Sequence, residues 1–232
     1  MFTLIIANKN YSSWSLRPWV LMTTLQIPFE EQLLPFGAAF SDPAFLRVAP
    51  SGRVPVLRDG DLSVWDSLAI TEYLAERHAG VWPDEARARA WARSAAAEMH
   101  SGFSTLRTIC AMNCGLRVAL NETNASLAAE LDRMAALWTD GLTRFGGPWL
   151  AGQAFTAVDA FFAPVAFRIQ TYGLNVGEAA DAYVRRLLAL PAMQQWYAQA
   201  LAEPWRDAAH EADSLAAGRV SADLRAVPDP AV

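Results

Sequence analysis

The chain has 232 residues, of which 53% are hydrophobic and 19% charged, and its formal net charge is -5 at pH 7. This composition is typical of a folded globular protein and excludes a disordered chain. The negative charge argues against a general binder of nucleic acids or of anionic membranes. Only two cysteines are present, too few for a disulfide scaffold in a chain of this length.

The N-terminal stretch MFTLIIANKN lacks the basic start and the long apolar region of a signal peptide. No apolar run approaches the roughly 18 residues that a membrane-spanning helix needs. The nearest candidate, TAVDAFFAPVAF, is interrupted by Asp159 and Pro164. We therefore expect a cytoplasmic protein that does not span a membrane.

Residues 1–79 alternate strand and helix signals. FTLIIA is a short apolar run of strand length, and it is followed by a helical pattern from about Ser15 to Leu25 and by a weaker strand in PFEEQLLPF. VPVLRDGDLSVW contains two short apolar segments around Asp59-Gly60, which is typical of a tight hairpin. DSLAITEYLAERH then reads as a helix with Asp66 or Ser67 as its N-cap. The order predicts one small mixed sheet with helices packed on it.

The character of the chain changes near 80–84. Residues 86–217 are rich in alanine, have helical periodicity and contain no convincing strand, so we expect an all-helical second domain. One of its helices opens with Thr156 and Asp159, a spacing at which the carboxylate can reach back to the N-cap. Residues 218–232 are predicted to form a loosely ordered tail.

Hydroxyl groups gather in the stretch NYSSWSLRPW. Because proline has no backbone donor, we expect Pro18 in the first turn of the helix, with the N-cap near Ser15. This places Tyr11, Ser12 and Ser13 in the loop after the first strand, where open α/β sheets commonly bind ligands. The hydroxyls and the helix N-terminus favour an anion site, and the alternative is that they only cap the helix.

Two more stretches carry binding signals. In SGRVPVL, we expect Val54-Pro55 to begin an edge strand, and a cis bond there would present the Val54 backbone to an extended peptide. In WDSLAI, the N–H groups of a helix start could hold a carboxylate while Asp66 holds an ammonium group, with Ser67 beside it. A ligand with a thiol, a peptide backbone and an amino-acid end would use all three places, and glutathione is such a ligand.

The combination of SSWSLRPW, SGRVPVL, WDSLAITEYLAE and FTAVDAFFAPV, in this order, resembles the soluble glutathione transferases over nearly the whole chain. The resemblance implies a thioredoxin-like N-terminal domain, an all-helical C-terminal domain, a homodimer and a role in detoxification. The serine loop is most similar to those of the theta and zeta classes. By that match Ser12 stabilises the thiolate of glutathione, Ser13 supports it, and Tyr11 is a minor competitor.

The implied activity is glutathione transfer to small electrophiles, with glutathione as co-substrate and no metal. The residues implied to hold glutathione are Ser12, Arg53, Val54, Pro55, Asp66 and Ser67. The alternatives are a glutathione-dependent isomerase of the maleylacetoacetate type, a peroxidase, or a non-catalytic glutathione-binding or interaction module. Zeta-like enzymes have a cysteine where this chain has Trp14, which argues against the isomerase. The serine loop contains no cysteine, which argues against a disulfide reductase.

The resemblance places the acceptor pocket near HSGFSTLRTICAMNCG. At helical spacing His100, Phe103 and Arg107 share a face, and Met112 lies near its end. The acceptor candidates are Trp14, Phe103, Arg107 and Met112. Arg107 could meet an acidic acceptor or the glutathione carboxylate, or it could form an ordinary salt bridge. We expect His100 to have a packing role. Cys110 and Cys114, four residues apart on a possible helix face, are expected to be reduced packing thiols, because a metal site would need more ligands.

Overall fold

The computed structural model describes residues 1–121 and 124–225. Its N-terminal domain is built on a four-stranded sheet in the order β2-β1-β3-β4, formed by β1 (Phe2–Ile6), β2 (Phe29–Leu33), β3 (Val56–Asp59) and β4 (Leu62–Trp65). β1 pairs parallel with β2 and antiparallel with β3, and β3 pairs antiparallel with β4. The predicted mixed sheet and thioredoxin-like architecture are confirmed.

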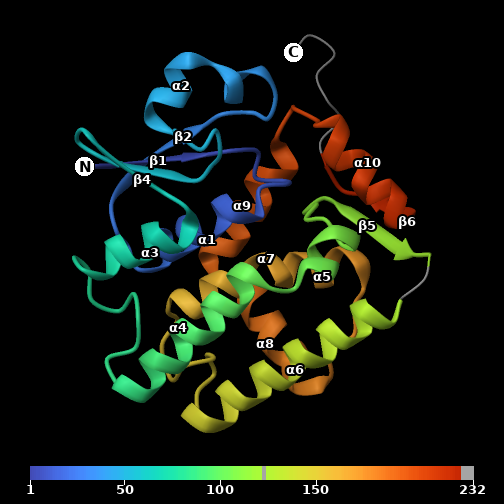
Figure 1. The fold of residues 1–232 in the computed structure, drawn as a ribbon. Coiled ribbons are helices and arrows are strands. Elements are labelled where there is room, and N and C mark those ends of the chain that lie inside the picture. Colours follow the sequence, from blue (N-terminus) through green and yellow to red (C-terminus); the bar gives the residue numbers. More distant parts are fainter. Residues whose placement is uncertain (122–123, 226–232) are drawn as a thin grey trace.

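Helices cover both faces of this sheet. α1 (Ser13–Thr24) and α3 (Ser67–Ala75) lie between the sheet and the helical region, whereas α2 (Pro43–Val48) lies on the outer side (Figure 1). The alternation of β1 matches this arrangement, because Leu4 and Ile6 join the large core while Ile5 packs with Phe45 of α2. The nearly continuous apolar run of β1 thus reflects a strand buried on both faces.

The β3–β4 hairpin is present, with Gly60 and Asp61 as its two-residue loop and Gly60 at a φ of 62°. The prediction that Val54-Pro55 begins an edge strand is wrong. β3 starts one residue after Pro55 and lies between β1 and β4. Because Pro55 precedes the first paired residue, the sheet does not require its missing N–H. The Val54-Pro55 bond is cis.

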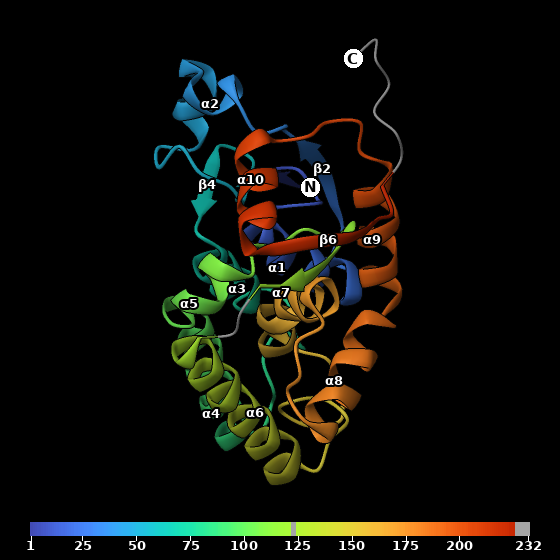
Figure 2. The same cartoon turned by 90° about the vertical axis from the view of Figure 1, so that its right-hand side faces the viewer.

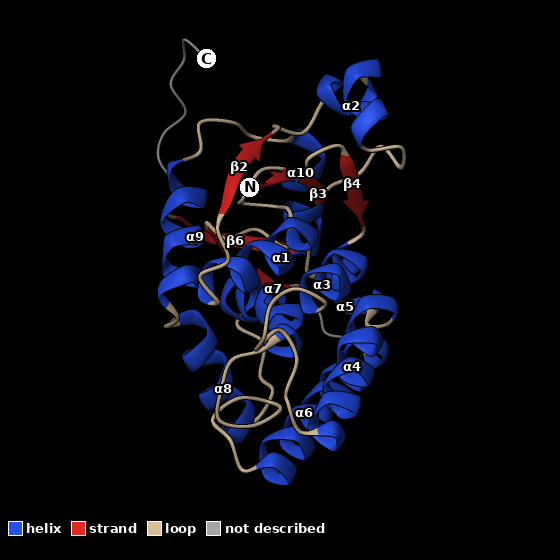
Figure 3. Cartoon of the chain, turned by 90° about the vertical axis from the view of Figure 1, so that its left-hand side faces the viewer, coloured by secondary structure: helices blue, strands red, loops and turns tan. Residues whose placement is uncertain are grey.

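The second part of the chain is predominantly helical, as predicted. Its helices are α4 (Ala86–Ser101), α5 (Ser104–Ile109), α6 (Ala125–Phe145), α7 (Ala157–Tyr172), α8 (Glu178–Leu188), α9 (Pro191–Ala202) and α10 (Ala208–Ala217). Figure 3 shows the strands of the sheet at one end of the molecule and α4, α6 and α8 extending to the other. No helix within residues 1–121 and 124–225 has both the length and the apolar character needed to cross a membrane.

Helix α7 is the centre of this packing, with contacts to α1, α4 and α8, and it is buried on nearly all sides. Asp159 fixes its start, because the carboxylate accepts the backbone N–H of Thr156 at 3.0 Å, as the spacing predicted. The other carboxylate oxygen accepts the Tyr183 hydroxyl at 2.9 Å and the N–H of Leu150 at 3.1 Å. The buried carboxylate of Asp159 therefore joins α7 to α8 and to the loop that precedes α7.

The two-stranded ribbon of β5 (Leu116–Leu120) and β6 (Gly218–Asp223) corrects two expectations. We expected no strand in 86–217 and a loose tail from 218 onward, and both are wrong for these strands. The strands lie about 100 residues apart and stabilise each other by pairing, which no local pattern reveals. Figure 2 shows β6 beside α10, which also contacts β5. Residues 226–232 of the expected tail lie outside the described residues.

Candidate functional site

Two adjoining cavities of about 340 and 330 Å³ lie where the N-terminal domain meets the helical region. The first is lined by the serine loop, by part of α5 and by α10. The second is lined by the segment before β3 and by the start of α3. Trp14, Arg53 and Val54 line both cavities, so the two are neighbours.

The serine loop begins the helix earlier than the sequence suggested. Ser12, and not Ser15, is the N-cap of α1, and Pro18 therefore lies beyond the first turn. The side chain of Ser12 makes no capping hydrogen bond, and its Oγ lies 2.7 Å from Oγ of Ser15. Ser15 Oγ also accepts the backbone N–H of Ala7 at 3.2 Å. Ser12 is thus positioned from below by a buried hydroxyl while it lines the first cavity.

The neighbours of Ser12 have different partners. Ser13 Oγ accepts a hydrogen bond from Arg168 of α7 at 3.4 Å. The Tyr11 hydroxyl donates to Glu211 Oε1 at 2.6 Å. Burial, and then the hydrogen bond to Glu211, raise the pKa of Tyr11 to about 12. The Tyr11 proton is therefore already engaged, and the group stays neutral at physiological pH.

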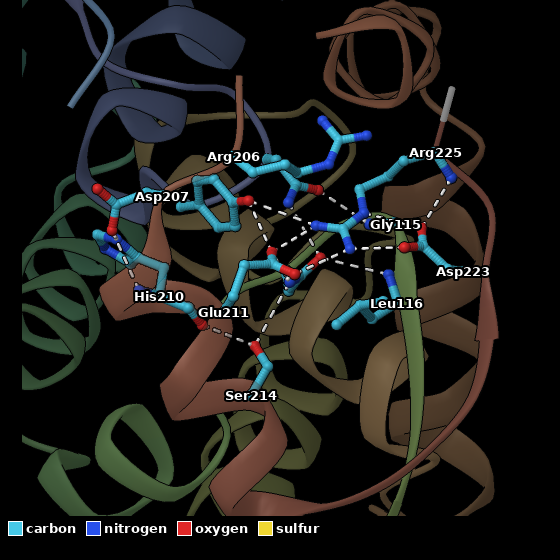
Figure 4. A network of polar contacts seen from close by, with 12 residues as sticks. Gly115, Leu116, Arg206, Asp207, His210, Glu211, Ser214, Asp223 and Arg225 are labelled. Atoms are coloured by element: carbon cyan, nitrogen blue, oxygen red, sulfur yellow. Dashed lines mark hydrogen bonds and ion pairs between the residues drawn. The ribbon is translucent and has the colours of Figure 1, made fainter. Parts of the chain in front are cut away.

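Glu211 and Arg225 form the centre of a polar network that joins α10 to the end of β6 (Figure 4). The Arg225 guanidinium contacts both Glu211 oxygens and pairs with Asp223 at 2.7 Å. Asn113 donates at 3.2 Å to Glu211 Oε1, the oxygen that also accepts the Tyr11 hydroxyl. The network fastens the C-terminal segment beside Tyr11, so α10 closes one side of the first cavity.

The residues just before the serine loop are held by the helical region. Glu203 accepts the backbone N–H of Lys9 at 2.6 Å, and the Trp196 indole donates to the Lys9 carbonyl at 2.9 Å. The Asn10 side chain donates to Asn113 at 3.0 Å and accepts the N–H of Gly115 at 3.0 Å. The start of the loop is therefore anchored to the helical region.

The second cavity contains the other predicted glutathione-binding residues, namely Arg53, Val54, Pro55, Asp66 and Ser67. Asp66 is the N-cap of α3, one of the two caps that the sequence allowed, and its Oδ1 accepts the N–H of Leu68 at 2.7 Å. Ser67 is 1% exposed, and its hydroxyl has no hydrogen-bond partner among the described residues. A buried hydroxyl without a partner is costly, so Ser67 is suited to a ligand atom.

His100, expected only to pack, also lines the second cavity. Its Nδ1 lies 3.4 Å from the Arg17 guanidinium, which can only donate, so Nδ1 is the acceptor and Nε2 carries the proton. Nε2 faces Asp66 Oδ2 at 3.4 Å. Burial lowers the pKa of His100, which therefore stays neutral at pH 7. The imidazole thus orients the carboxylate of Asp66 without neutralising it.

Three of the four acceptor candidates line the first cavity, namely Trp14, Arg107 and Met112. Phe103 does not line either cavity and is buried in the core. The expected continuous helix face is wrong, because α4 ends at Ser101 and Phe103 adopts a φ of 52° before α5 begins. This break turns Phe103 inward and still leaves Arg107 beside Trp14, 5.3 Å from its ring centroid.

Among the lining residues of the first cavity that the sequence interpretation missed are Arg168, Phe36 and His210. Arg168 carried a signal, since it is the only basic residue in the apolar helix α7. Phe36 and His210 carried none, because their rings stack 4.7 Å apart across 174 positions of sequence. The sequence predicted Ser15 only as the N-cap of the helix, and its hydrogen bond with Ser12 was not expected.

The two cysteines are buried and unpaired. Burial raises the pKa of the Cys110 thiol to about 12 and raises that of Cys114 further. Cys110 is the C-cap of α5, and Cys114 follows after the helix has ended, so they do not share a helix face. Within the described part of the chain, no three His, Cys, Asp or Glu side chains gather as a metal site would require.

Comparisons with known proteins identify the family of this chain. Residues 11–77 match the family model "Glutathione S-transferase, N-terminal domain". Glutathione S-transferase GstB of Escherichia coli is 30% identical over 203 residues, which cover 80% of this chain and 88% of that protein. A probable maleylacetoacetate isomerase of Vibrio cholerae is 28% identical over 206 residues, covering 84% of this chain and 95% of that protein.

A solved glutathione transferase homologue from Burkholderia, with bound glutathione, has the same fold. It superposes with a TM-score of 0.64 at 23% identity, covering 86% of this chain and 97% of that one. The four-stranded sheet with its helices and the predominantly helical second part thus have the fold of a known structure. From the similarity to GstB over 80% of the chain and the matched N-terminal domain, the chain belongs to the glutathione S-transferase family.

Proposed function

We propose that this protein transfers glutathione to small electrophiles and that the Ser12 hydroxyl stabilises the glutathione thiolate. The observation that carries the proposal is the position of Ser12, at the N-terminus of α1 with a hydroxyl that caps no backbone group and lines a cavity. The adjoining cavity offers Asp66 and Ser67 at the start of a second helix. A thiol and an amino-acid end can therefore be held by one continuous site.

The available stabilisation is large enough for this chemistry. A free thiol has a pKa near 8.5, and lowering it by about 2 units requires about 2.7 kcal/mol. A hydrogen bond to a charged group contributes about 1.5–3 kcal/mol, and the dipole of α1 adds roughly 0.3–1 kcal/mol. Ser12 and the helix N-terminus together suffice without a covalent enzyme intermediate.

Each remaining residue has an assigned role in this proposal. Asp66 and Ser67 hold the γ-glutamyl end, with Asp66 oriented by His100. Val54 pairs its backbone with the cysteinyl unit, Pro55 shapes the turn before β3, and Arg53 binds the glycyl carboxylate at the rim. Ser13, bonded to Arg168, supports the position of the serine loop.

The reaction then has two steps. On binding, the glutathione thiol releases its proton to water, and Ser12 donates a hydrogen bond to the resulting thiolate. The thiolate forms a bond to an electrophilic carbon held in the first cavity, and the leaving group departs with its bonding electrons. The protein contributes thiolate stabilisation and the positioning of both reactants.

The test is an ultraviolet titration of thiolate absorbance for protein-bound glutathione, in the wild type and in Ser12→Ala. We expect a thiol pKa below 8.5 in the wild type and an increase of about one to two units in the variant. Ser94→Ala, on the exposed face of α4, is the matched control. Equal pKa values in wild type and Ser12→Ala would overturn the role of Ser12.

A glutathione-dependent isomerase is the second candidate, favoured by the relative of that name from Vibrio cholerae. Such an enzyme would add the thiolate to a double bond and release it after rotation, so glutathione would be regenerated. Consumption of glutathione with each turnover distinguishes transfer from isomerisation. A peroxidase would instead yield glutathione disulfide, and a non-catalytic binding module would bind glutathione with an unshifted thiol pKa.

The homodimer, the cytoplasmic location and the role in detoxification remain predictions of the family resemblance. Sedimentation at micromolar concentration tests the dimer, and a monomeric mass would contradict it.

A further inference from the structure

The first cavity contains cationic side chains that the proposed function does not yet use. Arg107 and Arg168 both line it, and Arg17 lies close behind, with its guanidinium 4.2 Å from the Trp14 ring centroid. Arg17 and Arg168 are only 2% and 4% exposed. Arg17 and Arg107 therefore flank the Trp14 ring, and Arg168 lines the same cavity, at the meeting of α1, α5 and α7.

Their own protein partners are mostly neutral. Arg168 donates to the backbone carbonyls of Arg107 and Cys110, and Arg107 donates to the carbonyl of His100 at 3.1 Å. The Nε atoms of Arg17 and Arg168 have no hydrogen-bond partner among the described residues. A buried guanidinium without an anion is unfavourable, because its charge is removed from water without compensation.

The nearby carboxylates are committed elsewhere or exposed. Asp66 caps α3 and faces His100. Glu130 accepts the backbone N–H groups of Thr105 and Leu106 at the start of α5. Asp213 lies at the solvent-exposed edge of the cavity. Burial and the mutual repulsion of the arginines lower the pKa of Arg17 to about 9, so the cluster is electrostatically strained in the protein alone.

The same cavity has an aromatic wall built by four rings in one column. Phe40 stacks on Phe36 at 5.4 Å, Phe36 on His210 at 4.7 Å, and His210 on Tyr11 at 5.1 Å, each pair with an interplanar angle of 25°. All four rings line the cavity. Such a wall suits a flat ligand, and the volume of about 340 Å³ is enough for one substituted ring.

We infer that the acceptor is a planar electrophile that carries a carboxylate, with its ring against the aromatic column and its carboxylate at Arg107 and Arg168. This inference takes the reaction, glutathione transfer, from the proposed function. It takes the class of acceptor from the residues that line the first cavity. A carboxylate there relieves the unpaired buried charge and gains charge-assisted hydrogen bonds, which a neutral ring of the same shape does not.

The kinetic test compares 4-chloro-3-nitrobenzoate with its methyl ester as acceptors. In both, the thiolate bonds to the ring carbon that carries chlorine, and chloride leaves with the bonding electrons. Each kcat/KM is divided by the uncatalysed rate constant to remove intrinsic reactivity. We expect the wild type to favour the acid at least tenfold and Arg107→Gln to reduce this ratio at least tenfold, whereas Arg185→Gln on the exposed face of α8 keeps it.

A binding measurement separates this inference from the proposed function. Calorimetry with benzoate and its neutral isostere benzamide requires no reaction, and we expect benzoate to bind at least tenfold more tightly, with the difference lost in Arg107→Gln. Arg107→Lys, which retains the charge at the same position, should keep most of the preference. A loss in Arg107→Gln alone is then due to the missing charge and not to a folding defect. Equal binding of benzoate and benzamide overturns the inference even if the ester is turned over. Preferential benzoate binding without any turnover supports the anion site and contradicts the transferase activity.

Discussion

The Oγ atoms of Ser12 and Ser15 lie 2.7 Å apart, and Ser15 is fully buried beneath the serine loop. In the protein alone Ser12 donates to Ser15 Oγ, which also accepts the N–H of Ala7. Because Ser15 is itself a hydroxyl, it can donate to Ser12 when the Ser12 hydroxyl rotates to donate to a bound thiolate. The pair therefore connects the end of β1 to the proposed catalytic hydroxyl.

Ser15→Ala should consequently affect both stability and chemistry. It leaves the buried N–H of Ala7 without an acceptor, which should lower the free energy of unfolding by about 1–3 kcal/mol. The thiol pKa of bound glutathione should rise, but by less than in Ser12→Ala, because Ser12 itself remains. Urea unfolding and the ultraviolet titration measure the two effects, with Ser94→Ala as control. A variant with wild-type stability and thiol pKa would show that Ser15 has neither role.

Ser67→Ala should weaken glutathione binding by about tenfold, the effect of one hydrogen bond worth about 1.4 kcal/mol. The hydroxyl has no protein partner to lose, so the stability of the protein without ligand should stay nearly unchanged. Calorimetric titration with glutathione measures the dissociation constant, and Ser63→Ala on β4 provides the control. An unchanged dissociation constant would remove Ser67 from the binding site.

Tyr11→Phe should leave the thiol pKa unchanged, because the Tyr11 proton is donated to Glu211 and not to the cavity. It should instead lower the free energy of unfolding by about 1–3 kcal/mol, since Glu211 loses a buried partner. Hydrogen exchange in α10 and β6 should increase for the same reason. If the thiol pKa rose by a unit or more, Tyr11 would replace Ser12 as the thiol-activating residue.

The stability of the protein should depend on pH through Glu203. Burial raises the pKa of Glu203 to about 7 in the folded protein, against about 4.3 in an unfolded chain. The folded state thus binds the proton more tightly, and the stability that this proton provides is lost as the pH rises from about 4.3 through about 7.

Glu203→Gln should reduce this loss between pH 5 and pH 7 by about 2 kcal/mol. Asp159, whose pKa burial raises to about 6, contributes a loss of the same sign that remains in the variant. Urea unfolding at both pH values measures the difference, and Glu30→Gln on the exposed edge strand β2 is the control. If the free energy of unfolding depended on pH in the same way in the wild type and in Glu203→Gln, Glu203 would not be the group responsible.

Local sequence signals predicted the N-terminal domain well. The apolar run of β1, the hairpin turn and the Asp66 cap each depend on neighbours within a few residues, and each is present in the structure, the turn one residue later at Gly60-Asp61 than the Asp59-Gly60 signal indicated. The same signals singled out Ser12 and Ser67, which line the first and the second cavity. They misplaced the start of α1, because Ser12 and Ser15 are equally good caps by residue type and only the packing under the loop decides between them.

The features that the sequence did not reveal depend on contacts between distant segments. β5 and β6 are stable only as a pair, and Phe36 meets His210 only after α10 has docked. Phe103 has a positive φ, which is rare for a phenylalanine, so the residue type gave no indication of this backbone conformation. The first cavity was therefore harder to predict than the second, which is built mainly from one continuous domain.

The anchoring of Lys9 and Asn10 has a consequence for recombination between relatives. Their backbone and side-chain partners, Glu203, Asn113 and Trp196, all belong to the helical second part of the chain. A chimera that joined residues 1–79 to the helical half of another family member would inherit the serines without the groups that hold their loop. Exchange of halves should therefore yield folded but poorly active hybrids unless these three residues are transplanted together with the loop.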